Sequence, residues 1–165
     1  MKRTKIFSLV FIFFVLWLGV QARGDKFTPY DAKELAINAA ALIETKGLHR
    51  AREILLDPDG GFMKGQKNEL YAFVLNFNGD LLVHPRPDLD GRNALDWKDQ
   101  AGNFMVKEMI SMAKRQSKGW VKHLSWDPKT DMVRPKATFV VRIGDSEMLM
   151  GSGIYMDTWD EFRFS

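Results

Sequence analysis

The residues best suited to bind a small anion flank two prolines in the second half of the chain. Lys136 follows Pro135 at the expected start of a strand, and His84 precedes Pro85 at the expected end of another. An anion that leaves water needs a cation and hydrogen-bond donors, because otherwise the lost hydration prevents binding. Ligands are usually met at loops and strand ends, so Lys136 and His84 are candidates for contact with a carboxylate. An ordinary imidazole at His84 would make that contact pH-dependent between roughly pH 5.5 and 7.5.

Aromatic side chains could complete such a pocket. Their rings would supply apolar walls, and their indole and phenol groups would supply hydrogen-bond donors. The candidates are Tyr71, Trp120, Trp126 and Tyr155, and Arg92 in an intervening loop is an alternative cation.

Each candidate also has a structural interpretation. His84 could bond a backbone carbonyl beside its proline, and Lys136 could be a solvated strand end. Trp120 alternates with Lys122 and Leu124, so packing in a core explains it as well as ligand contact does. Tyr155 could cap the sheet. The residues alone leave these alternatives open.

Other chemistries find little support in the sequence. There is no cysteine, which excludes thiol chemistry and thiolate metal sites. The three histidines lie in different expected elements without metal-ligand spacing, and the turn at 88–93 lacks the terminal glutamate of a calcium loop. Gly151-Ser152-Gly153 lacks the context of a nucleophile or phosphate loop, which favours close backbone packing. We therefore predict no metal, no cofactor and no enzymatic activity.

The N-terminus has the order of a secretory signal peptide. Lys2, Arg3 and Lys5 precede an apolar run over 6–20, which ends at Val20-Gln21-Ala22. We expect a signal peptide at 1–22, or an uncleaved membrane anchor as the alternative, and a periplasmic or secreted domain at 23–165. Removal of the three cations from a chain of net charge +3 leaves 21 basic and 21 acidic residues, which gives no support for nucleic-acid binding.

The remaining pattern predicts an α+β fold. Thr28-Pro29 begins a long amphipathic helix that Gly47 interrupts. Strands over 70–77 and 81–84 flank Asn78-Gly79, a turn expected to have positive φ at both residues. A helix over 104–116 and strands over 119–126, 136–143 and 147–155 follow. This order predicts a PAS-like five-stranded antiparallel sheet, with a long N-terminal helix and a helix inserted after the second strand.

Several short motifs occur along this pattern in a characteristic order. They are Phe73 to Asp80, Val83-His84-Pro85, Gly91-Arg92-Asn93, Lys98-Asp99, Gly102, Gly119-Trp120-Val121, Trp126, Pro135-Lys136 and Gly151-Ser152-Gly153-Ile154-Tyr155. As an ordered set, they resemble the single Cache domain family, the extracytoplasmic sensor modules of bacterial chemoreceptors and histidine kinases. The resemblance covers residues 30–157.

The resemblance implies a module that binds or senses small molecules, often short carboxylates. By motif position, His84, Trp120 and Lys136 are the first expected contacts, followed by Tyr71 and Tyr155. Family members are commonly followed by a signalling domain, and we expect none after this domain. We therefore expect a stand-alone binding protein, or an accessory to a membrane receptor, histidine kinase or transporter, with a homodimer as a further expectation. The rival interpretations are a structural protein that dimerises through its first helix around a vestigial pocket, and an unrecognised hydrolase.

Overall fold

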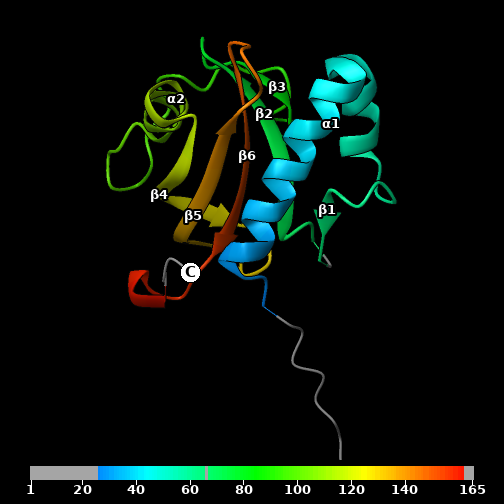
Figure 1. The fold of residues 1–165 in the computed structure, drawn as a ribbon. Helices are drawn as coiled ribbons and strands as arrows, with labels where there is room; N and C mark the ends of the chain where they lie inside the picture. The colour runs from blue at the N-terminus through cyan, green and yellow to red at the C-terminus, as the bar shows by residue number, and fades with distance from the viewer. Residues whose placement is uncertain (1–25, 66, 162–165) are drawn as a thin grey trace, which may run out of the picture.

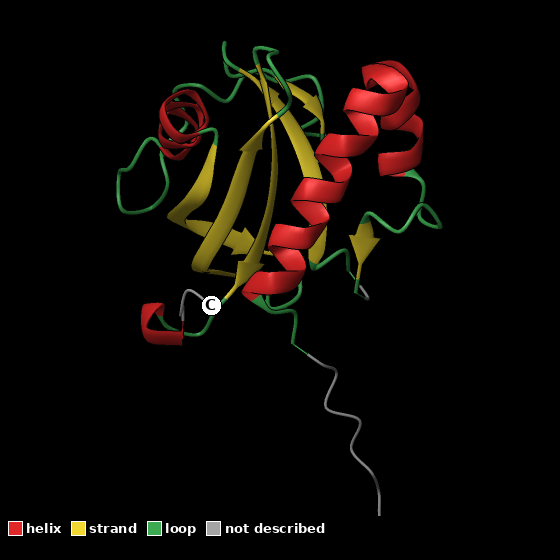
Figure 2. Cartoon of the chain, viewed as in Figure 1, coloured by secondary structure: helices red, strands yellow, loops and turns green. Residues whose placement is uncertain are grey.

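Two helices pack on opposite faces of one antiparallel sheet (Figure 1, Figure 2). The computed structural model describes residues 26–65 and 67–161; the predicted signal peptide lies outside them. The elements are α1 (Pro29–Leu56), β1 (Met63–Lys64), β2 (Leu70–Asn76), β3 (Leu81–Val83), α2 (Met105–Gln116), β4 (Lys118–Asp127), β5 (Met132–Arg142), β6 (Met148–Tyr155) and a 3-10 turn, Trp159–Glu161. The strand order is β1-β2-β6-β5-β4, and β3 pairs with β2. The predicted α+β, PAS-like arrangement is confirmed, with β1 as a sixth, two-residue strand that the sequence did not reveal.

The long helix α1 begins and bends where the sequence predicts. The Thr28 side chain accepts a hydrogen bond from the Asp31 N–H, Asp31 bonds back to the Thr28 N–H, and Pro29 occupies the first turn. Gly47 has φ 74° and ψ 159°, which kinks the helix. Alanines on the buried face of the helix let it lie close to the sheet. The residues buried on this face are Ala32, Leu35, Ala36, Ala39, Ala40, Ile43, Ala51 and Leu55. Among the described residues, neither helix combines the length and the hydrophobicity that a bilayer span requires.

Strand alternation gives the sheet two different faces. On β5, Ala137 and Phe139 face α1 and join its apolar core, whereas Lys136 and Thr138 face the other way. The register sets Lys136 opposite Tyr155 and Thr138 opposite Gly153. The α1 face is therefore a filled core, and the opposite face carries buried polar side chains beneath α2 and the segment 84–104.

The turn between β2 and β3 differs from the prediction. Gly79 has φ 90°, but Asn78 does not have positive φ. The Gly79 N–H donates to the Asn76 carbonyl, the Asn76 N–H donates to the Asp80 carbonyl, and the Asn76 side chain accepts from the Asn78 and Asp80 N–H groups. A longer loop with a single left-handed glycine therefore replaces the two-residue turn. A side chain at Gly79 would meet Leu95.

Strand β5 begins before Pro135, so Lys136 lies inside the strand and not at its start. Pro135 lies opposite Leu124 in the ladder. Leu124 directs its N–H away from β5, to the buried carboxylate of Asp99 at 3.0 Å. Proline is tolerated here because residue 135 does not need to donate a backbone hydrogen bond to β4. The same contact ties the segment before α2 to the edge of the sheet.

Candidate functional site

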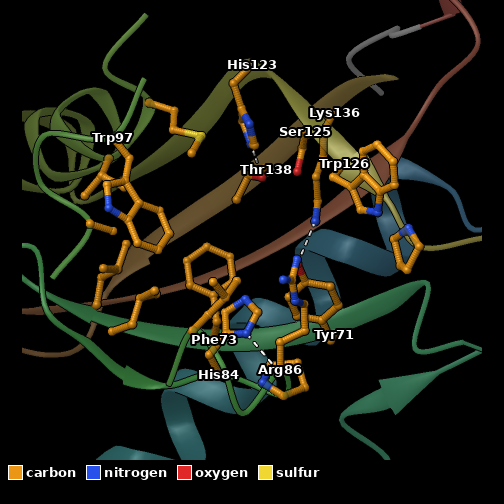
Figure 3. Close-up of a pocket in the computed structure, with 18 of the residues that line it drawn as sticks. Tyr71, Phe73, His84, Arg86, Trp97, His123, Ser125, Trp126, Lys136 and Thr138 are labelled. Atoms are coloured by element: carbon orange, nitrogen blue, oxygen red, sulfur yellow. Dashed lines mark hydrogen bonds between the residues drawn. The ribbon is translucent and has the colours of Figure 1, made fainter. Parts of the chain in front are cut away.

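A cavity of about 190 Å³ lies between the sheet, α2 and the segment 84–104 (Figure 3). One end is polar and the other is apolar. Three cationic side chains line it, and none of its described lining residues is an aspartate or glutamate. The residues that line it include Lys67, Tyr71, His84, Arg86, Trp97, Met105, Met109, His123, Ser125, Trp126, Lys136, Thr138 and Tyr155.

The ammonium group of Lys136 is the centre of the polar end. Lys136 is 3% exposed, and its Nζ donates to the hydroxyl of Tyr71 at 3.0 Å and to that of Tyr155 at 3.4 Å. Burial opposes its charge, but the two phenol oxygens outweigh burial and hold the pKa of Lys136 above its ordinary value. The group is therefore a buried cation whose described hydrogen-bond partners are neutral.

Two of these three groups keep a hydrogen for a ligand. Tyr155 donates its own O–H to the Trp126 carbonyl at 2.6 Å, so it acts toward Lys136 as an acceptor. Tyr71 also accepts from Lys136, but the described chain offers no acceptor for its O–H. An ammonium has three N–H bonds, of which two are used. One N–H of Lys136 and the O–H of Tyr71 therefore remain to bind an anion.

Gly153 lets Lys136 reach Tyr71 across the intervening strand β6. A Cβ atom at Gly153 would lie 2.5 Å from Thr138 Oγ1, 2.8 Å from the Ala137 carbonyl oxygen and 3.0 Å from Lys136 Cε. Real Cβ atoms do not approach other atoms so closely, so only glycine leaves this path open. The predicted close backbone packing of the Gly151-Ser152-Gly153 segment is thereby confirmed, and Gly151 likewise leaves room for Phe73.

His84 adds a further donor. The Arg86 backbone N–H donates to His84 Nδ1 at 3.0 Å, which requires the proton of a neutral ring to lie on Nε2. Burial, followed by the charges of Lys136 and Arg86, lowers the pKa of His84 to about 4. The ring is therefore neutral at physiological pH, and the expected titration between pH 5.5 and 7.5 is wrong. The backbone N–H of His84 is fixed by Asp90 at 2.8 Å.

Two cations on this cavity were not predicted. Arg86 follows Pro85, and Lys67 precedes β2; both line the cavity. Arg86 bonds Asp88 through Nε at 3.1 Å and through a terminal nitrogen at 2.6 Å. This pairing leaves part of the guanidinium for a ligand. The only signal for Arg86 in the sequence was a basic residue two positions after His84. Whether such a side chain reaches the cavity depends on the path of the loop, which the sequence does not indicate.

The structure brings together five of the seven predicted residues. Lining the cavity are Tyr71, His84, Trp126, Lys136 and Tyr155. Trp120 does not line it, because it lies opposite Phe139 in the ladder and therefore packs on the α1 face, with ring centroids 5.1 Å apart. Arg92 lies outside as well, with its guanidinium 5.1 Å from the ring centroid of Trp97.

Trp97 and α2 close the apolar end. Trp97 and Trp126 lie at opposite ends of the cavity (Figure 3). Met105 and Met109 reach the cavity from α2, where they belong to the apolar core and also form part of the cavity wall. A ligand that fills this space would place its charge near Lys136 and an apolar part near Trp97.

His123 and Thr138 form a separate polar pair in the wall, with His123 Nε2 3.0 Å from Thr138 Oγ1. Burial and the charge of Lys136 lower the pKa of His123 to about 4, so this ring is also neutral. Within residues 26–65 and 67–161, no group of three or more metal-ligating side chains is close enough to hold an ion.

Comparison with known proteins finds one family model, described as Cache domain, which matches residues 62–163. The sensor histidine kinase MctS of Rhizobium johnstonii is 34% identical over 89 residues, which is 53% of this chain and 19% of that protein. The chain thus spans about a fifth of that relative's length.

Solved structures share the fold. A methyl-accepting chemotaxis protein from Vibrio parahaemolyticus is similar with a TM-score of 0.65 at 21% identity, over 78% of this chain and 88% of its own. A Cache chemosensory domain described by its carboxylic acid recognition is similar with a TM-score of 0.60 at 20% identity, over the same shares of the two chains.

Proposed function

The chain belongs to the Cache domain family of extracytoplasmic sensor modules, and from this premise we propose that its cavity binds a small carboxylate with an apolar body. The observation that supports this most directly is Lys136. A buried cation without a carboxylate partner is costly to desolvate, and an anionic ligand offsets that cost. Lys136, Tyr71 and His84 keep hydrogens for a ligand and line the same cavity, so together they would suit the two oxygens of a carboxylate.

The lining also limits the ligand class. An α-amino acid carries an ammonium group, which needs an acceptor or a negative charge when it is buried. The described cavity wall offers no acidic side chain and holds three cations. We therefore expect monocarboxylates to bind and amino acids to bind poorly. In this role the domain would bind its ligand without converting it.

The domain would act as a stand-alone binding protein or as an accessory to a separate membrane partner. Its resemblance to part of a sensor histidine kinase makes a kinase, a chemoreceptor or a carboxylate transporter the candidate class of partner. Lys26 bonds Asp157 at 2.8 Å, so the entry to α1 and the exit from β6 lie together (Figure 1). A ligand-dependent change at Tyr155 would reach both ends there.

Thermal unfolding with a panel of two- to four-carbon carboxylates and amino acids tests the proposal. A ligand at a hundredfold excess over its Kd stabilises the native state by about 2.7 kcal/mol, which raises Tm by several degrees. We expect a rise with carboxylates for the wild type and for Lys118→Met, a matched substitution of an exposed strand lysine. We expect none for Lys136→Met. An unchanged Tm across the panel, or an equal rise in both variants, would contradict the proposal.

One observation favours a structural alternative. Tyr30 and Ile37 lie one heptad apart on α1 and are 64% and 40% exposed, which suits helix contact in a homodimer. A dimer that forms with no ligand response would support dimerisation around a vestigial pocket. A dimer that also binds a carboxylate would exclude the vestigial pocket and support the binding role.

A further inference from the structure

The pair formed by His123 and Thr138 has no part in the carboxylate contacts described above. The register sets His123 on β4 opposite Lys136 on β5, and Thr138 is two residues further along the same face of β5. His123 is 5% exposed and Thr138 is 1% exposed, and both line the cavity. The pair therefore adjoins the position that we assign to the ligand's charged end.

The hydrogen bonds of the pair fix the position of its protons. His123 Nδ1 lies 3.3 Å from the Leu124 carbonyl oxygen. A carbonyl only accepts, so Nδ1 must carry the ring proton. In a neutral ring Nε2 is then an acceptor, and it takes the hydroxyl proton of Thr138 at 3.0 Å. The low pKa of His123 agrees with this neutral state.

This assignment leaves the Thr138 oxygen as an acceptor toward the cavity. Its one hydrogen is directed to His123, and its lone pairs can receive a hydrogen bond. The matching ligand group is a hydroxyl, which donates. A ketone oxygen offers no hydrogen and a methylene offers no polar contact, while an ammonium is repelled by the neighbouring cations.

We propose that His123 and Thr138 form a hydroxyl-recognition subsite, through which the cavity selects a hydroxylated short carboxylate over its unsubstituted and oxo counterparts. This inference rests on the proposed carboxylate site and adds the second functional group of the ligand. His123 acts through Thr138, as the positioning residue that fixes the threonine hydroxyl.

Calorimetric titration with three carboxylates of equal carbon number tests the selection. The probes are lactate, propionate and pyruvate. One neutral hydrogen bond contributes about 0.5–1.5 kcal/mol, so we expect lactate to bind about 2- to 13-fold more tightly than propionate, with pyruvate no tighter than propionate. Equal binding of lactate and propionate, or tightest binding of pyruvate, would overturn this inference and leave the carboxylate site intact. Binding of none of the three would overturn both.

Substitutions locate the selection. Thr138→Val removes the acceptor and should abolish the preference for lactate, with propionate affinity retained. Thr138→Ser keeps the hydroxyl and should keep the preference, which provides a test even if the valine variant folds poorly. Ser125→Ala removes another lining hydroxyl and should also leave the preference unchanged. A lactate preference that persists in Thr138→Val, or that disappears in Ser125→Ala alone, would overturn the assignment.

Discussion

Mild acid should destabilise this protein well before its carboxylates titrate. Two buried histidines, His84 and His123, each have a pKa of about 4 in the folded chain against an ordinary value of 6.5. The unfolded chain therefore binds more protons than the folded chain as the pH falls from 6.5 toward 4. Because stability rises with pH wherever the unfolded state holds more protons, the free energy of unfolding must fall over this window.

The size of the loss follows from these pKa values. Between about pH 7.5 and about pH 5, each histidine should lower the free energy of unfolding by about 2 kcal/mol, and the two together by about 4 kcal/mol. This is a large part of the 5–15 kcal/mol typical of domains. Aspartates contribute little here, because those whose pKa is displaced have it lowered and remain ionised in both states. They are Asp31, Asp80, Asp88, Asp90, Asp99, Asp127 and Asp157.

Urea unfolding followed by tryptophan fluorescence at a series of pH values measures this loss. His84→Asn and His123→Gln place an amide oxygen where the ring nitrogen accepts a hydrogen bond, so each keeps an acceptor and removes a titrating group. Each variant should lose about half of the pH dependence, and the double variant should lose nearly all of it. A wild-type stability that is constant or rises from about pH 7.5 to about pH 5 would refute the reasoning.

Four further substitutions test the packing and the binding contacts on the two faces of the sheet. Gly153→Ala forces a Cβ to within 2.5 Å of Thr138 Oγ1. We therefore expect the free energy of unfolding in urea to fall by about 1–3 kcal/mol and carboxylate binding to weaken. An unchanged free energy of unfolding would contradict the packing described. Ser152→Ala removes a buried hydroxyl that has no partner in the described chain. The free energy of unfolding of this variant should therefore equal that of the wild type or exceed it by about 1 kcal/mol. A clearly lower value would mean that the hydroxyl is hydrogen-bonded. Trp120→Phe should leave ligand affinity unchanged in calorimetry, whereas Trp97→Ala should weaken it. A loss of affinity in Trp120→Phe with unchanged affinity in Trp97→Ala would indicate that Trp120 contacts the ligand.

The sequence predicted the elements well because their signals are local. Thr28-Pro29 and Gly47 act on their own helix, and the alternation from Leu70 is visible without any partner strand. The strand β1 escaped prediction because two residues carry no period. The predicted turn at Asn78-Gly79 was wrong because the side chain of Asn76 accepts hydrogen bonds that stabilise a longer loop. The turn preference of the Asn-Gly dipeptide does not take the hydrogen bonds of a neighbouring side chain into account.

The site was predicted in part, for a different reason. Lys136, Tyr71 and Tyr155 meet only through the register of three strands, and family position supplied what periodicity could not. The prediction of Trp120 in the site was wrong because alternation assigns the residues of β4 to two faces of the sheet but does not indicate which face borders the cavity. His123 was dismissed because it has no metal spacing, although it is opposite Lys136 in the ladder.

The proposed binding role requires that the buried ammonium of Lys136 receives the charge of the ligand. Calorimetric titration of the wild-type protein with propionate and with the isosteric, uncharged propionamide tests it most directly. Loss of one partner from a buried charge pair costs about 2–5 kcal/mol, so propionamide should bind at least about 30-fold more weakly. Equal affinities for the acid and the amide would show that the ligand's charge does not meet Lys136 and would contradict the account.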